Sequence, residues 1–172
     1  MYTAFELIEL LNKENYNITV HQHNALFTVE DSRKLRGKIG GAHSKNLFLK
    51  NKKNEFFLLS CEEASEIDLK KISKSLELGN VSFAKEGYLE KYLKIKPGSV
   101  SPFALLNDKD HFVNFYLEQT LYESKFVNFH PLINTFTVKM ETKKFIEFMI
   151  ENNKKIHIFS SHERKILKTY GK

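Results

Sequence analysis

The chain has 172 residues, of which 41% are hydrophobic and 15 are phenylalanine, and its formal net charge is +6. This length and apolar content predict one folded domain with its own core and exclude a disordered chain. No apolar run reaches the roughly 18 residues of a membrane span, and the first residues are unlike a signal peptide. We therefore expect a soluble, cytoplasmic protein without membrane contacts. The single cysteine, Cys61, is expected to be a small buried side chain.

Basic residues are concentrated in two segments. Residues 32–53 hold eight lysines and arginines and no acidic residue, and residues 154–172 hold six against one acidic residue. A basic footprint on an otherwise acidic chain favours a polyanionic partner, with a solvated lysine surface as the alternative. The candidate contacts to such a partner are Arg33, Lys34, Arg36, Lys38 and Lys50.

Local patterns predict the elements in chain order. Thr3 and Glu6 form a capping box ahead of an apolar stripe, which predicts a helix over residues 3–13. A strand at 18–22 follows, and Asp31 can cap a short helix through Leu35. The next predicted elements are a hairpin of 46–49 with 55–59, a helix along 67–76, a strand at 81–83 and a helix around 86–93.

In the second half, residues 103–106 and 112–117 predict a hairpin around 107–110, and 125–129 with 133–138 predict another strand pair. Thr142 can cap a helix through Ile150, and 156–159 is the last predicted strand. Strand pairs interleaved with helices indicate an α+β fold with a mixed, largely antiparallel, curved sheet flanked by helices. We place one domain at 1–159 and a basic C-terminal tail at 160–172.

All three prolines lie in two unusual segments. Pro97 and Pro102 bracket a loop of small residues, and Pro131 follows His130. Proline fixes φ and removes a donor, so the backbone path is dictated here, and the loop can leave N–H groups free for a ligand. Prolines that merely end strands are the alternative.

The common catalytic motifs are missing from the sequence. It has no nucleophile elbow, dinucleotide fingerprint or phosphate-binding loop. His21 and His23 point the same way on a strand but have no further metal-ligating motif, so we predict no metal and no cofactor. Asp108 and Asp110 have the character of turn residues. Lys45 remains, at the point where polar residues after two glycines enter an apolar strand, where it can face an anion or simply be solvated.

Three segments together carry a family resemblance: the lysine block (residues 41–49), the proline loop (97–105) and the histidine block (128–135). In this order and spacing they resemble the YbaK/prolyl-tRNA synthetase-associated editing domains, and most of all the free-standing Ala-tRNA(Pro) deacylases, the ProXp-ala or PrdX-like group. The resemblance covers about residues 3–159. Ser44 and Ser101 stand where threonine is expected, and both keep the hydroxyl.

The resemblance implies an enzyme that hydrolyses the ester of mischarged Ala-tRNA(Pro) in trans. Lys45 would bind the 3′ end of the tRNA and Asn46 would position it. Backbone N–H groups of Gly98, Ser99 and Val100 would bind the ester carbonyl. Ser101 and Pro102 would bind the substrate, with Pro102 fixing the exit of the loop. His130 would line the aminoacyl pocket unless it only caps a turn. The other pocket residues would be Phe129, Leu35 and Phe27.

The implied partners are the acceptor stem and CCA end of tRNA(Pro), with transient contact to prolyl-tRNA synthetase, and we expect a monomer. The family implies water attack assisted by the terminal ribose 2′-OH, without a metal. The alternatives are a deacylase for Cys-tRNA(Pro) or Ser/Thr-tRNA, a non-catalytic tRNA-binding module, and a metal-dependent hydrolase.

Overall fold

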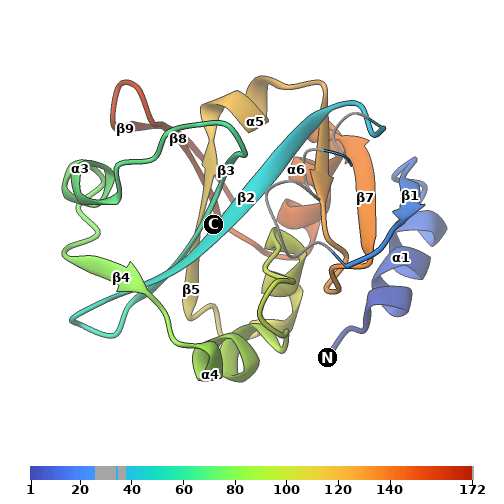
Figure 1. Ribbon diagram of the computed structural model, residues 1–172, viewed down its shortest axis with the longest axis horizontal. Helices are drawn as coiled ribbons and strands as arrows, with labels where there is room; N and C mark the ends of the chain where they lie inside the picture. Colours follow the sequence, from blue (N-terminus) through green and yellow to red (C-terminus); the bar gives the residue numbers. More distant parts are fainter. Residues whose placement is uncertain (26–33, 35–37, 172) are drawn as a thin grey trace.

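The computed structural model describes residues 1–25, 34 and 38–171. Its strands lie in one mixed sheet of order β1-β7-β6-β2-β3-β5-β8-β9, with β4 also paired to β2 (Figure 1). The β2·β6, β3·β5 and β5·β8 pairs are parallel and the others are antiparallel. The strands are β1 (Thr19–Gln22), β2 (Ala42–Asn51), β3 (Phe56–Glu62), β4 (Val81–Phe83), β5 (Val113–Glu118), β6 (Phe126–Phe129), β7 (Phe136–Glu141), β8 (Ile156–Ser160) and β9 (Lys165–Tyr170).

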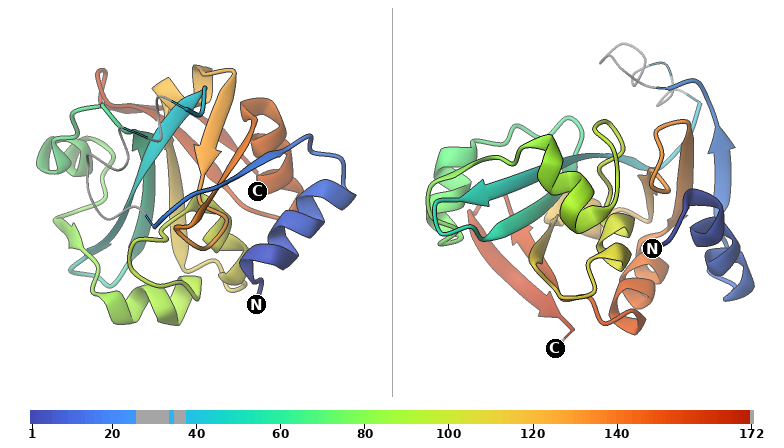
Figure 2. Two further views of the ribbon diagram at one scale, coloured as in Figure 1. Left: turned by 45° about the vertical axis from the view of Figure 1, so that its right-hand side comes forward. Right: turned by 90° about the horizontal axis from the view of Figure 1, so that it is seen from below.

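Helices cover both faces of this sheet, and the left view of Figure 2 shows α3 and α6 on opposite sides of it. The helices are α1 (Ala4–Lys13), α3 (Leu69–Ser75), α4 (Glu86–Tyr88), the π-helix η1 (Leu89–Leu93), the 3₁₀-helix η2 (Pro102–Asn107), α5 (Gln119–Glu123) and α6 (Thr142–Glu151). The predicted α+β class with a mixed, largely antiparallel sheet is confirmed. No helix of the described ranges is long and apolar enough to cross a membrane.

Several local predictions are confirmed, most clearly at the first helix. Thr3 accepts from the Glu6 N–H while the Glu6 carboxylate accepts from the Thr3 N–H, so the capping box is complete. The β2–β3 hairpin and the strands β1, β4, β6 and β8 also form where they were expected, whereas β7 covers 136–141 instead of the predicted 133–138. The helix predicted from Asp31 to Leu35 lies outside the described residues.

Two predictions are wrong. Residues 103–106 lie in η2, not in a hairpin strand, because Ser101 caps the helix by accepting from the Phe103 N–H. As a result, β5 pairs in parallel with β3 and β8. Thr142 begins α6 but does not cap it, since its hydroxyl donates to the carbonyl of Ser124. Beyond β8 the chain turns back and adds β9 to the sheet edge.

Strand β3 has apolar side chains on both faces, so both faces of the sheet must be covered by helices. Its alternate side chains are buried on both faces, as expected for an interior strand. Phe57, Leu59 and Cys61 face α3, whereas Phe56 and Leu58 face the larger core. That larger core also contains side chains of α1, η2 and α6.

The ring of Phe103 is the centre of the larger core. It is fully buried and meets the rings of Phe129, Phe145 and Phe148 edge-on at 6.0, 5.9 and 6.0 Å. We expect Phe103→Ala to lower the free energy of unfolding by about 3–5 kcal/mol, measured by urea denaturation. The control, Phe83→Ala, removes a ring that is 64% exposed and should change stability by less than about 1 kcal/mol. Equal losses in both variants would contradict this view of the core.

Candidate functional site

Two of the three blocks, the lysine block and the histidine block, meet at the junction of β2 and β6. These strands pair in parallel over only two positions, Ala42 with Val127 and His43 with Asn128. Beyond these positions they separate: Figure 1 shows β2 crossing the molecule diagonally while β7, the other partner of β6, runs down its right side. The lysine block therefore lies against the start of the histidine block.

The side chain of Asn128 closes this junction. Its Nδ2 donates to the carbonyls of Gly40 and Ala42 at 3.3 and 3.1 Å, and the Ser44 hydroxyl donates to its main-chain oxygen at 3.1 Å. Gly41 has φ +101°, and a Cβ there would lie 3.1 Å from Asn128 Nδ2. The glycine is therefore required both by its backbone conformation and by this close approach.

The proline loop contacts the histidine block from the other side. Gly98 has φ +83°, and a Cβ there would lie 3.4 Å from Asn134 Nδ2. The Ser99 N–H is already bonded to the carbonyl of Lys96. In the described part of the chain, the N–H groups of Gly98 and Val100 have no acceptor. Two of the three N–H groups predicted for catalysis are thus available to a ligand, and Ser101 and Pro102 instead begin η2.

Lys45 and Asn46 occupy opposite faces of β2, because side chains alternate along a strand. Lys45 is half-buried beside Cys61 of β3 and donates to the carbonyls of Glu63, at 3.2 Å, and Ser65. The carboxylate of Glu118, which is fully buried, accepts from the Glu62 N–H at 2.7 Å and so holds the start of the same turn. The ammonium of Lys45 is therefore fixed at the end of the β2–β3 hairpin.

Asn46 belongs to a short polar chain on the other face. Its Oδ1 accepts from the buried hydroxyl of Ser60 at 2.6 Å, and its Nδ2 donates to Ser44 Oγ at 3.3 Å. Ser44 in turn donates to the Asn128 carbonyl. These bonds fix the orientation of the Asn46 amide and connect it to the β2–β6 junction.

His130 is held as a neutral imidazole with one free acceptor. Its Nδ1 lies 2.8 Å from the Phe136 carbonyl, which can only accept, so Nδ1 carries the proton. In the described residues Nε2 has no partner and keeps its lone pair. Burial holds the pKa of His130 below its ordinary value, and the nearby His23 and His43 act in the same direction while the Phe136 bond opposes them. The His23 ring lies 6.0 Å away.

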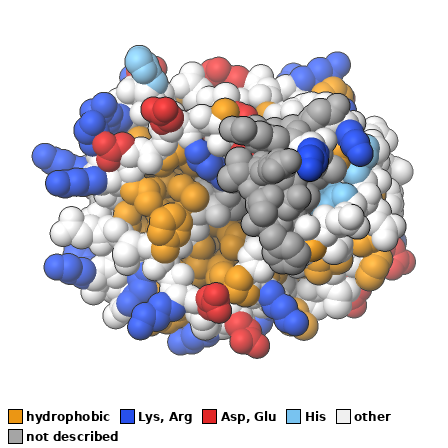
Figure 3. Space-filling view, in the orientation of Figure 1, with side chains coloured by type: hydrophobic (Ala, Val, Ile, Leu, Met, Phe, Trp, Pro, Cys, Tyr) orange, Lys and Arg blue, Asp and Glu red, His pale blue; other side chains and the backbone are white. Residues whose placement is uncertain are grey.

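The remaining predicted residues fall into those that the structure describes and those that it does not. Phe129 is buried in the larger core, whereas Phe27, Leu35, Arg33 and Arg36 lie outside the described residues. Lys34 and Lys38 are exposed, and the Lys50 ammonium lies 5.3 Å from the ring centre of Tyr88. On the face shown in Figure 3, most lysines and arginines lie around the edge rather than in one patch.

Comparison with known proteins decides the family. A family model described as an aminoacyl-tRNA editing domain matches residues 23–148. The chain belongs to this family. A prolyl-tRNA synthetase associated domain-containing protein 1 from Xenopus laevis is 35% identical to this editing domain over 149 residues, covering 84% of the chain and 88% of the relative.

Two further comparisons agree. The prolyl-tRNA editing protein ProX of Acetoanaerobium sticklandii is 33% identical over 133 residues, covering 77% of this chain and 81% of ProX. A solved structure of a candidate trans-editing enzyme for prolyl tRNA synthetase superposes with a TM-score of 0.65 at 14% identity, covering 91% of this chain and 96% of that one. At this identity the structure supports the shared fold alone.

Three further polar residues lie at the β2–β6 junction or beside His130: Asn128, His43 and His23. Sequence reasoning did not single out Asn128 and His43, and it considered His23 only as a metal ligand. Asn128 is 3% exposed, and its Oδ1 has no partner in the described residues. His43 Nε2 lies 2.7 Å from the Ile39 carbonyl, and His23 Nε2 lies 2.9 Å from Thr137 Oγ1. The sequence did offer one indication for two of them: Asn128 lies in the histidine block and His43 in the lysine block, and both blocks carry the resemblance. No group of three or more metal-ligating side chains occurs in the ranges that the structure describes.

The lowered pKa of His130 predicts an acid-sensitive fold. A neutral His130 contributes its full stability above the unfolded-state pKa of about 6.5, and the contribution is lost as the pH falls through the lower folded-state pKa. Between pH 7 and pH 5 we expect the unfolding free energy to fall less steeply in His130→Asn than in the wild type, measured by urea denaturation. The exposed His162 offers the control, because His162→Asn should keep the wild-type slope. Unchanged slopes in both variants would contradict the assignment.

Proposed function

We propose that this editing domain is a trans-acting deacylase that hydrolyses the ester of mischarged Ala-tRNA(Pro), and so prevents alanine from being inserted at proline codons. The observation that carries the proposal is the meeting of the lysine block, the proline loop and the histidine block around Asn128 and Asn134. The names of the relatives, which refer to prolyl-tRNA editing and to prolyl-tRNA synthetase, support the tRNA class.

Each block has a distinct task in this mechanism. The fixed ammonium of Lys45 binds the polar 3′ end of the tRNA, and the oriented amide of Asn46 positions it. The free N–H groups of Gly98 and Val100 bind the ester carbonyl and stabilise the oxyanion that forms on attack. One such donor typically contributes about 10²–10³ in rate.

The free lone pair of His130 completes the site. As a neutral acceptor, Nε2 can receive a hydrogen bond from the substrate ammonium or from the attacking water. The terminal ribose 2′-OH assists the water, and the ester C–O bond breaks to release alanine and the free 3′-OH of the tRNA. A pocket sized for alanine excludes proline sterically. The synthetase pocket, which must admit proline, cannot reject the smaller alanine, because each missing methylene lowers the binding free energy by only about 1–3 kcal/mol.

The direct test is a deacylation panel with Ala-, Cys-, Ser- and Pro-tRNA(Pro). We expect Ala-tRNA(Pro) to be hydrolysed with the highest kcat/KM, and Lys45→Ala to lower that value at least about a hundredfold because the 3′ end is no longer held. The control, Lys74→Ala, removes an exposed lysine of α3 and should keep activity within about threefold. Preference for Cys- or Ser-tRNA(Pro) would support the alternative deacylases, and binding without turnover on any substrate would support a tRNA-binding module.

The role of the substrate hydroxyl is tested separately. With a 2′-deoxy terminal adenosine, the tRNA should bind with unchanged affinity but be hydrolysed at least about a hundredfold more slowly, because the water loses its assisting group. Single-turnover deacylation measures the rate, and filter binding measures the affinity. Full activity on the deoxy substrate would exclude substrate assistance. Loss of activity on the normal substrate after treatment with a chelator would instead indicate a metal-dependent hydrolase.

A further inference from the structure

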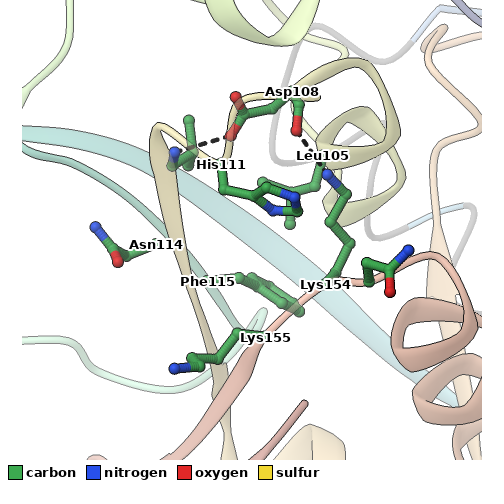
Figure 4. A pocket seen from close by; sticks show the side chains of 9 residues that line it. Leu105, Asp108, His111, Asn114, Phe115, Lys154 and Lys155 are labelled. Atoms are coloured by element: carbon green, nitrogen blue, oxygen red, sulfur yellow. Dashed lines mark hydrogen bonds between the residues drawn. The ribbon is translucent and has the colours of Figure 1, made fainter. Parts of the chain in front are cut away.

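A polar cavity lies at the amino ends of β5 and β8. It has a volume of about 360 Å³ and is lined by Asp108, His111, Asn114, Asn153, Lys154 and Lys155 over an apolar floor that includes Phe115 (Figure 4). This size falls within the range of small-ligand pockets. The cavity has no part in the editing mechanism described above.

The cavity contains a buried cation whose hydrogen bonds are incomplete. Lys154 is only 7% exposed, and its Nζ donates to the main-chain oxygen of Asp108 at 2.6 Å. Its other two N–H groups have no acceptor among residues 1–25, 34 and 38–171. Burial lowers the pKa of Lys154, and the negative charge of Asp108 opposes that shift. A buried ammonium with unused donors is costly unless an anion completes its shell.

The Asp108 carboxylate does not fill that role. It accepts from the N–H groups of Phe112 and Val113 at 3.1 and 2.8 Å, so both oxygens are used by its own turn. Figure 4 shows this carboxylate directed away from Lys154, which reaches the Asp108 carbonyl instead. No ion pair within 4.0 Å joins Lys154 to a carboxylate in the described part of the chain.

The rest of the lining adds donors and positive charge. Lys155 and Asn114 are exposed and, in Figure 4, extend to the left, away from the ammonium of Lys154, whereas the His111 ring lies beside Lys154. Two ammonium groups, an imidazole and an amide match the donors that commonly bind phosphate oxygens. The only carboxylate in the lining is already satisfied.

The cavity is remote from the editing site. Asn114 donates to the Phe56 carbonyl at the start of β3, whereas Lys45 pairs with Cys61 near the other end of that strand. Five residues of strand separate the two positions by about 17 Å. A ligand in the cavity therefore does not contact the editing residues.

We propose that this cavity is a phosphate-binding site, in which Lys154 and His111 contact the phosphate and the exposed Lys155 and Asn114 line its rim, where Lys155 adds positive charge. The phosphate belongs either to a small phosphomonoester or to the backbone of an RNA. Both present the same oxygens to these side chains, so the source is left to the experiment.

The test uses the whole chain and inorganic phosphate at constant ionic strength. We expect saturable shifts of the His111 and Asn114 amide signals in ¹H–¹⁵N spectra and a rise in the melting temperature. Lys155→Ala should weaken phosphate binding at least about tenfold, and Lys154→Met should abolish it. Lys74→Ala removes an exposed lysine of α3 and should bind like the wild type. If Lys154→Met fails to fold, the exposed Lys155→Ala decides alone.

Competition experiments then identify the molecule that supplies the phosphate group. They also test whether the bound phosphate is an adventitious ion only. Displacement of phosphate by a duplex RNA of acceptor-stem length, lost in Lys155→Ala, supports a backbone phosphate. Displacement by glycerol phosphate but not by RNA supports a small phosphomonoester. Shifts that do not saturate, equal binding by wild type and Lys155→Ala, or displacement by neither competitor would overturn the site. Deacylation of a minimal aminoacyl-CCA substrate should be unchanged in Lys155→Ala, so this outcome is independent of the editing activity.

Discussion

The short parallel pairing between β2 and β6 is the contact on which the rest of the site depends. Two residue pairs join the β1–β7–β6 part of the sheet to the rest, and the Asn128 amide reinforces them by bonding to Gly40 and Ala42. After these two pairs β2 and β6 diverge, and the histidine block continues to Asn134, which lies close to Gly98 of the proline loop. The buried amide of Asn128 therefore holds the lysine block and the histidine block together at the point where their strands diverge.

Alternation along β2 gives Lys45 and Asn46 two different chemical environments. Lys45 belongs to the face where carbonyls of the β3 turn hold its charge, whereas Asn46 belongs to the face where hydroxyls orient its amide. A substrate at the edge of β2 would meet both faces. This arrangement explains why one strand can supply a charged group and a neutral hydrogen-bonding group side by side without a direct bond between them.

Local chemistry determined which predictions succeeded. The Thr3–Glu6 capping box and the apolar β2–β3 hairpin are encoded within a few residues, and both form as expected. Residues 103–106 are as apolar as a strand, and only the Ser101 cap, followed by Pro102, directs them into a helix. Lys154 was counted in a basic segment that was expected to face a polyanionic partner or solvent, but tertiary packing buries it. The contacts of Asn128 join residues more than 80 positions apart, so no local pattern could reveal them.

Because Cys61 is buried, the reactivity of its thiol can report when the β2–β3 hairpin separates from its neighbours. The thiol is fully buried, and burial together with Glu118 raises its pKa while Lys45 opposes the shift. A thiol-specific reagent can therefore react only after the hairpin that carries Lys45 has separated from its neighbours. Since there is one cysteine in the chain, the labelling rate measures the opening of that hairpin without any engineered probe.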